Sequence, residues 1–125
     1  RYPELLKRRY DMVRRYDAQL PQEVIRPAHL RPDMTSDCHL YLARIPGLNH
    51  ERRSAVITRM AERGVACNVH YKPLPLLTAY KNLGFRMEDY PNAYAQFENE
   101  ITLPLHTLLS DEDIDYVCAC LKECL

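Results

Sequence analysis

Nine prolines set the main limit on what this chain of 125 residues can fold into. A proline inside a helix or a central strand removes a backbone donor and clashes with the neighbouring backbone. The apolar patterns between the prolines therefore predict separate, short elements joined by loops and turns. The prolines are Pro3, Pro21, Pro27, Pro32, Pro46, Pro73, Pro75, Pro91 and Pro104.

Both ends of the chain have helical patterns. Within residues 2–20, apolar side chains recur at helical spacing, Pro3 suits the first turn, and Pro21 ends the segment. Residues 111–124 repeat apolar side chains at intervals of three, four and seven, directly after Ser110, a good N-cap. We therefore expect a helix at each end.

A further helix is expected over residues 50–63, in the middle of the chain. Asn49 can cap its start, and Gly64 suits the left-handed position that follows a last helical turn. Two shorter helices are expected near residues 76–82 and 92–99, where prolines and a glycine divide the pattern.

Three segments read as strands. Residues 38–45 are apolar on both faces, residues 65–71 alternate between apolar and polar, and residues 100–105 form a short apolar run. Pro104 cannot donate to a ladder, so the last segment is expected at a sheet edge. The order of elements predicts an α+β fold with a small antiparallel or mixed sheet of about three strands, packed against one helical layer.

Charge and hydropathy exclude some classes of protein. The 17 basic and 17 acidic residues cancel, so no general attraction to nucleic acid or to an anionic membrane is expected. No apolar run approaches the ~20 residues that span a bilayer. Basic residues crowd positions 7–15 and acidic residues positions 111–115, and we expect both groups on solvated helix faces.

The five cysteines show no pattern that is typical of a disulfide framework. Their number is odd and no C-x-x-C pair occurs. We expect reduced, mostly buried thiols in a cytoplasmic protein, with no metal site.

The alternation over 65–71 marks the main candidate site. Val65 and Cys67 share one face with Val69 and Tyr71, which is expected to meet the core. The opposite face carries Asn68 and His70 at the point where the strand becomes a loop, and ligand contacts often sit at such places. A single histidine is more often a structural hydrogen-bonding residue, so spacing alone leaves both interpretations open.

His39 is a second candidate, because it shares a face with Tyr41 on the first predicted strand. The alternative is a structural role, in which the imidazole of His39 forms a hydrogen bond with a neighbouring carbonyl group. Tyr71, Tyr80 and Tyr90 flank the loop after residue 71, where they line a pocket or pack on its rim.

Several stretches resemble the DegT/StrS family of aminotransferases, which make amino sugars on nucleotide carriers. The segment His70-Tyr71-Lys72-Pro73-Leu74 looks like the family's His-Tyr-x-Pro motif, and the other matching stretches follow in the family's order. They are Arg8 to Leu20, His39-Leu40-Tyr41, Arg53 to Val65, Leu77 to Gly84, Tyr90-Pro91-Asn92-Ala93, Leu103-Pro104-Leu105-His106 and Ser110-Asp111-Glu112-Asp113.

This resemblance implies that residues 1–125 are the C-terminal small domain of a fold-type-I aminotransferase, with residues 1–20 as an interdomain helix and 38–125 as an α+β core. The parent would be a homodimer that uses pyridoxal phosphate to aminate a keto-sugar nucleotide, commonly with glutamate as the amino donor. The cofactor would be held mainly by an N-terminal large domain that supplies the Schiff-base lysine. This chain alone, which has no catalytic residue of its own, would then be inactive.

The resemblance also assigns the contacts of this chain. His70 would contact substrate or cofactor, supported by Tyr71, Asn68 and His39, with Lys72 on the substrate side or at the surface. An apolar face of residues 2–20 would be exposed where the large domain packs. Two alternatives remain: a stand-alone binding module, and a nucleic-acid binder that uses the arginines of residues 8–15.

Overall fold

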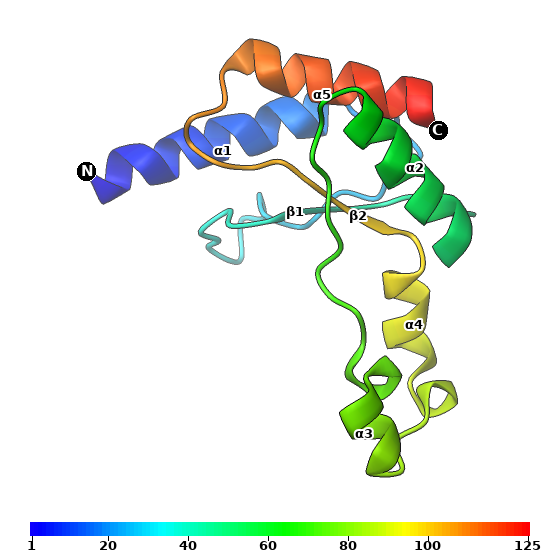
Figure 1. The fold of residues 1–125 in the computed structure, drawn as a ribbon. Helices are drawn as coiled ribbons and strands as arrows, with labels where there is room; N and C mark the ends of the chain where they lie inside the picture. Colours follow the sequence, from blue (N-terminus) through cyan, green and yellow to red (C-terminus); the bar gives the residue numbers. More distant parts are fainter.

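In the computed structural model, which describes residues 1–125, the first and last helices of the chain lie side by side (Figure 1). Helix α1 spans Tyr2–Gln19 and helix α5 spans Asp111–Cys124. Ser110 caps α5 with the predicted capping box, because its hydroxyl accepts from the Asp113 N–H while the Asp113 carboxylate accepts from the Ser110 N–H. Their contact buries Met12, Val13 and Tyr16 on α1 and Ile114, Val117 and Leu121 on α5.

The sheet consists of two antiparallel strands, β1 (Tyr41–Arg44) and β2 (Glu100–Leu103). A single bridge on each side extends it, because Ile25 pairs with Arg44 and Asn68 pairs with Thr102. The spatial order is therefore Ile25, β1, β2, Asn68. All four residues of β2 are buried, which makes it the central element of the fold.

The three long helices form one layer against this sheet, as predicted (Figure 1). Helix α2 (His50–Glu62) packs on α5 and on β2. Asn49 caps its start by accepting a hydrogen bond from the Arg52 N–H, 2.9 Å away. Gly64 follows its end with φ = 78°, the left-handed region that favours glycine. None of the helices is long and apolar enough to cross a bilayer.

A protruding arm, residues 72–97, extends away from this body (Figure 1). It contains two 3₁₀ turns and two short helices close to the predicted positions. These elements are η1 (Leu74–Leu76), α3 (Thr78–Asn82), η2 (Met87–Asp89) and α4 (Pro91–Phe97).

More of the exposed apolar surface lies on or beside this arm than on α1. Tyr71 and Leu83 are each 74% exposed, and further large apolar side chains of the arm are exposed with them. On α1, only Tyr2 and Leu5 are large, apolar and exposed. The apolar face that was expected to be exposed on residues 2–20 is therefore limited to Tyr2 and Leu5, because Met12, Val13 and Tyr16 are buried.

The predicted strand over 65–71 is reduced to the single bridge at Asn68. Side chains bind its next backbone donors, since the side-chain Oδ1 of Asn68 accepts from the Val69 N–H at 2.7 Å and Glu100 Oε2 accepts from the His70 N–H at 3.0 Å. The first two backbone donors after the bridge are therefore taken by side chains rather than by a neighbouring strand. Tyr71, expected to face the core, is exposed instead.

The other two predicted strands are also shorter than expected. Cys38 has φ = 50°, which takes the chain out of the extended conformation, so that β1 begins only at Tyr41. Residues 100–105 were expected at a sheet edge, yet β2 has partners on both sides. Pro104 is compatible with this central place because the ladder ends one residue earlier, at Leu103.

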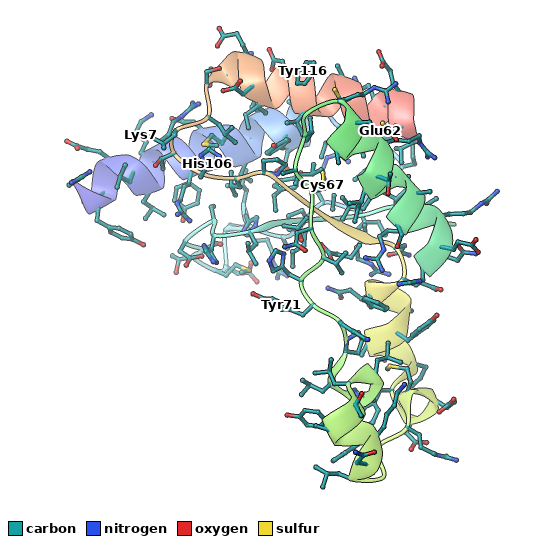
Figure 2. All side chains as sticks on the ribbon, in the orientation of Figure 1. Lys7, Glu62, Cys67, Tyr71, His106 and Tyr116 are labelled. Atoms are coloured by element: carbon teal, nitrogen blue, oxygen red, sulfur yellow. The ribbon has the colours of Figure 1, made fainter.

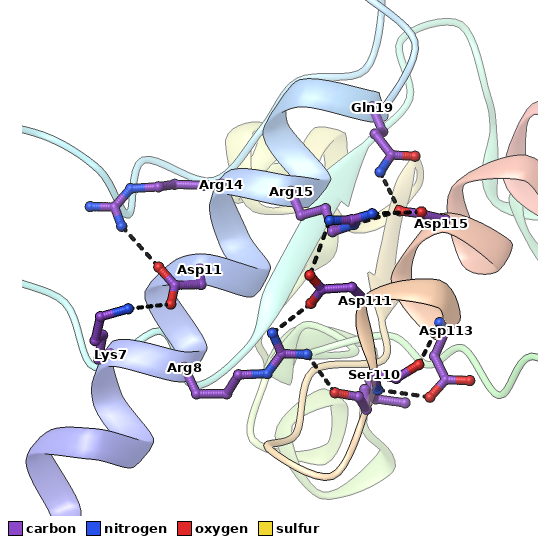
Figure 3. A network of polar contacts seen from close by, with 11 residues as sticks. Lys7, Arg8, Asp11, Arg14, Arg15, Gln19, Ser110, Asp111, Asp113 and Asp115 are labelled. Carbon is purple, nitrogen blue, oxygen red and sulfur yellow. Dashed lines mark hydrogen bonds and ion pairs between the residues drawn. The ribbon is translucent and has the colours of Figure 1, made fainter.

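Ion pairs join the basic and acidic segments that were expected to be separately solvated (Figure 3). Arg15 binds both carboxylate oxygens of Asp115, at 2.6 and 2.7 Å, and also reaches Asp111 at 3.1 Å. Arg8 donates to Asp111 at 2.6 Å and to the carbonyl oxygen of Leu109 at 2.6 Å. The two segments therefore form a polar seam along one side of the α1–α5 contact.

We predict that replacing Asp115 with Asn weakens this seam in a pH-dependent way. Hydrogen bonds from Arg15, then Gln19, lower the pKa of Asp115 to about 2 in the fold, below about 3.9 in an unfolded chain. Its carboxylate thus stabilises the fold above about pH 4, and this contribution is lost as the pH falls towards about 2. Urea denaturation of D115N should show a smaller free energy of unfolding at neutral pH and less further loss over that acid range.

The effect should be modest and should shrink with added salt, because the pair is partly exposed to solvent. Glu62→Gln is the matched control, since Glu62 is an exposed acid without an ion-pair partner. Equal acid sensitivity in wild type and D115N would show that the seam does not stabilise the fold.

Candidate functional site

The first predicted site residue, His70, lies two residues before the start of the arm. Its Nδ1 is 2.8 Å from the hydroxyl oxygen of Thr102, and this hydroxyl donates to Glu100 Oε1 at 2.5 Å. The other carboxylate oxygen of Glu100 accepts from the His70 backbone N–H. Glu100, Thr102 and His70 therefore form a closed set of hydrogen bonds.

This arrangement selects the tautomer of the imidazole. A hydroxyl has one hydrogen, and that of Thr102 is directed to Glu100, so its oxygen accepts from His70. Neutral His70 then carries its proton on Nδ1 and presents the Nε2 lone pair outwards. The strand β2 thus holds His70 as an oriented hydrogen-bond acceptor, or as a donor once Nε2 is protonated.

Glu100 is the buried end of this set, with only 1% of its surface exposed. Burial raises the pKa of Glu100, while the hydrogen bonds from Thr102 and from the His70 backbone oppose that shift. Glu100 forms no ion pair within 4 Å. The hydrogen bonds that it accepts are therefore the main interactions that offset the free-energy cost of burying its carboxyl group.

Tyr71 stands beside His70 with its ring edge-on to the imidazole, at a centroid distance of 4.6 Å and an angle of 85°. Figure 2 shows Tyr71 pointing away from the body at the start of the arm. Both residues border a cavity of about 280 Å³, which Gln96, Phe97 and Glu100 also line. The cavity therefore combines an oriented imidazole with a phenol and an amide.

The other predicted site residues are not brought into this cavity. The Asn68 side chain binds its own chain at the Val69 N–H, and Lys72 lines a different groove. His39 is exposed just before β1 and lines neither the cavity nor that groove. Of the predicted site residues, only His70 and Tyr71 therefore line this cavity, and Lys72 and His39 lie elsewhere.

Sequence reasoning missed two residues that bind His70, Glu100 and Thr102, and also the buried Arg53. Glu100 and Thr102 occupy alternate positions of the last strand and thus share its polar face, which period-two geometry could have revealed. Arg53 lies three and seven residues before the buried Val56 and Met60, so it belongs to the inward side of α2.

Arg53 is 2% exposed, and its Nε and Nη2 atoms have no hydrogen-bond partner. Its guanidinium carbon lies 4.8 Å from the centre of the Phe97 ring, a cation–π contact. Burial lowers the pKa of Arg53, and the nearby charge of Glu100 opposes this shift. The side chain is therefore a buried cation without a bound acceptor.

The chain does not supply a complete site for pyridoxal phosphate. That cofactor binds covalently to a lysine, and a lysine amine becomes nucleophilic near neutral pH when it is desolvated or lies near another cation. All four lysines of this chain are exposed: Lys7, Lys72, Lys81 and Lys122. No group of three or more His, Cys, Asp or Glu side chains is placed to hold a metal ion, and all five cysteines are free thiols.

Comparison with known proteins identifies the family. The model of the DegT/DnrJ/EryC1/StrS aminotransferase family matches residues 1–122. The chain belongs to this family. The fold agrees, since a Streptococcus pneumoniae protein named as a sugar aminotransferase, Spr1654, superposes with a TM-score of 0.96 at 54% identity. That structure covers 99% of this chain, whereas the chain covers 31% of it.

Two other proteins are similar to this chain over nearly its whole length. The aminotransferase TlmJ of Streptoalloteichus hindustanus is 32% identical with a TM-score of 0.85, over 99% of this chain and 32% of its own. The spore coat polysaccharide biosynthesis protein SpsC of Bacillus subtilis is 28% identical over 98% of this chain and 33% of its own. The chain thus spans about a third of the length of these relatives. Spr1654 is also known in a form with pyridoxal phosphate.

We predict that Thr102→Val releases the imidazole of His70. Valine keeps the shape of threonine but cannot accept from Nδ1, so the preference for the Nδ1–H tautomer should be lost. Nitrogen-15 NMR of the histidine side chains distinguishes the two tautomers directly. Thr102→Ser, which restores a hydroxyl, should return the wild-type spectrum, whereas an unchanged tautomer in T102V would exclude Thr102 as the orienting group.

Proposed function

We propose that this chain is the C-terminal domain of a pyridoxal-phosphate-dependent aminotransferase that aminates a keto-sugar nucleotide. Membership of the family over residues 1–122 supports the reaction class, and the likeness to Spr1654 supports a sugar as substrate. The name of SpsC supports a place in polysaccharide or glycoconjugate synthesis. We propose glutamate as the amino donor and the cytoplasm as the site of action.

The larger part of the parent holds the cofactor in this proposal. Pyridoxal phosphate supplies the electron sink for moving an amino group, and the protein supplies binding, orientation and proton transfer. Because every lysine here is exposed, the covalent lysine belongs to the remaining two thirds that the relatives have. This chain on its own is therefore expected to be inactive.

His70 carries the proposal, because β2 holds it in one orientation at the edge of a cavity. Its free Nε2 can accept from a sugar hydroxyl, or donate to an oxygen of the substrate when protonated. Tyr71 adds a hydroxyl to the same cavity, while Thr102 and Glu100 position the imidazole. Here these residues bind and orient the substrate against a cofactor held by the large domain.

The surfaces of the chain fit a larger assembly. An apolar hollow of about 390 Å³ on the arm is lined by Leu74, Tyr80, Phe85 and Tyr90, among others. Exposed apolar patches of this kind mark interaction sites in soluble proteins. We propose that the arm packs in the homodimer of the parent, with residues 1–20 as the interdomain helix and 38–125 as the small-domain core. A stand-alone module would have to keep this apolar surface in water.

The test is His70→Ala in the full-length enzyme. Removing the imidazole should lower kcat/KM for the keto-sugar nucleotide at least about tenfold, the loss expected from one hydrogen bond to substrate. Steady-state kinetics with saturating glutamate would measure this loss.

His106→Ala is the matched control, because His106 is an exposed histidine outside the His70 cavity. The control should retain wild-type kinetics. Wild-type kcat/KM in H70A as well would refute a direct role of His70, and no amino transfer to any keto-sugar nucleotide by the wild-type enzyme would refute the proposed reaction.

A further inference from the structure

Glu100 is a buried acid whose hydrogen bonds all lead to one side chain. It begins β2 and lines the cavity that His70 and Tyr71 border. A buried carboxylate destabilises a fold unless it is paired, and Glu100 forms no ion pair. Its hydrogen bonds come from the Thr102 hydroxyl, which binds the imidazole, and from the His70 backbone N–H. These contacts indicate a role at the imidazole rather than in the core.

The two oxygens of Glu100 have different partners. Oε2 faces the His70 N–H, which can only donate, whereas Oε1 faces the Thr102 hydroxyl, which can donate or accept. An ionised carboxylate requires this hydroxyl to donate, so that the Thr102 oxygen accepts from Nδ1 of His70. The ionisation of Glu100 therefore determines which nitrogen of the neutral imidazole carries the proton.

The surroundings of Glu100 include groups that favour its ionised form. Burial raises the pKa of Glu100, while the hydrogen bonds from Thr102 and from the His70 N–H and the charge of Arg53 oppose that shift. The Nε and Nη2 atoms of Arg53 have no hydrogen-bond acceptor, so no other group in the chain neutralises this charge through them.

His70 is the lining group of the cavity whose hydrogen-bonding role the fold fixes. The hydroxyl of Tyr71 can rotate and the amide of Gln96 has no partner in the chain, so each can donate or accept. Nε2 of neutral His70 can only accept. A substrate hydroxyl can donate to Nε2, whereas a carbonyl oxygen would face its lone pair and be repelled.

We propose that Glu100 is a positioning residue that acts through Thr102 and His70 to make the cavity bind a hydroxyl group and reject a carbonyl oxygen. This inference rests on the proposed function in one respect, the identity of the substrate as a keto-sugar. In such a substrate, rejection at His70 turns the reacting carbonyl towards the part of the site that the large domain supplies. The reversed orientation would place a hydroxyl where the carbonyl has to react.

Glu100→Gln in the full-length enzyme tests the path to the imidazole. The glutamine carbonyl oxygen can keep the contact with the His70 N–H, which leaves its NH2 group to donate to the Thr102 oxygen. The Thr102 hydroxyl then donates to Nδ1, so that neutral His70 should carry its proton on Nε2. Nitrogen-15 NMR of selectively labelled histidine side chains should show this reversal in E100Q. The double variant E100Q/T102V should not show it, because valine interrupts the path.

The kinetics of E100Q test the discrimination between hydroxyl and carbonyl. Once Nε2 donates, the keto-sugar nucleotide can also bind in the reversed, unproductive orientation. Unproductive binding lowers kcat and KM together and leaves kcat/KM nearly unchanged, because it competes with productive binding for the same free enzyme. We expect both constants to fall about tenfold, the effect of one hydrogen bond, in steady-state kinetics with saturating glutamate.

Glu98→Gln is the matched control, since Glu98 is a partly buried acid without an ion pair and outside the cavity. It should keep the wild-type tautomer, kcat and KM. Thr102→Val interrupts the same path without altering Glu100, and it should lower kcat and KM in the same sense even if E100Q proves unstable. An unchanged tautomer in E100Q would overturn the path, and a reversed tautomer with wild-type kcat and KM would overturn the discrimination.

The failure of this inference is distinguishable from that of the proposed function, because the NMR measurement needs no reaction. A reversed tautomer in E100Q, in a protein whose wild type transfers no amino group to keto-sugar nucleotides, would keep the path from Glu100 to His70 and remove the reaction. Full transamination with an unchanged tautomer in E100Q would keep the reaction and remove the path.

Discussion

The two-sided pairing of β2 is the constraint on which the rest of the structure depends. Because side chains alternate along a strand, Ile101 and Leu103 are buried in the hydrophobic core, while Glu100 and Thr102 are directed to His70. A shift of one residue in register would place the two polar side chains in the core and the apolar pair beside the imidazole. The same pairing thus fixes both the core and the orientation of His70.

The helices could be predicted from sequence because their determinants are local. Ser110, Asn49 and Gly64 mark ends that the structure reproduces, and the prolines mark the short elements of the arm. The strands were less predictable, since their extent depends on partners distant in sequence. At residue 69 the ladder ends because side chains bind the backbone donors, which no periodicity reveals.

The candidate site likewise has a part that local sequence predicts and a part that depends on residues distant in sequence. His70 and Tyr71 could be named as candidates from a motif, but the orientation of the imidazole depends on Thr102, 32 positions away. The burial of Arg53 was not predicted, because a charged residue within an apolar stripe is usually assigned to the surface. Its burial follows from α2 packing on the sheet, a tertiary effect. Lys72 adjoins His70 in sequence, yet the two side chains line different cavities.

The contact between α1 and α5 has a consequence for how the domain is made. Arg8 and Asp111 are 103 positions apart. Helix α1 is therefore synthesised well before α5, the helix against which it packs. Until α5 has been synthesised, Met12 and Val13 lack its cover and are open to association with other chains. Such a topology has many non-local contacts, which slow folding. Assembly during translation is therefore the stage at which this domain is most vulnerable to aggregation.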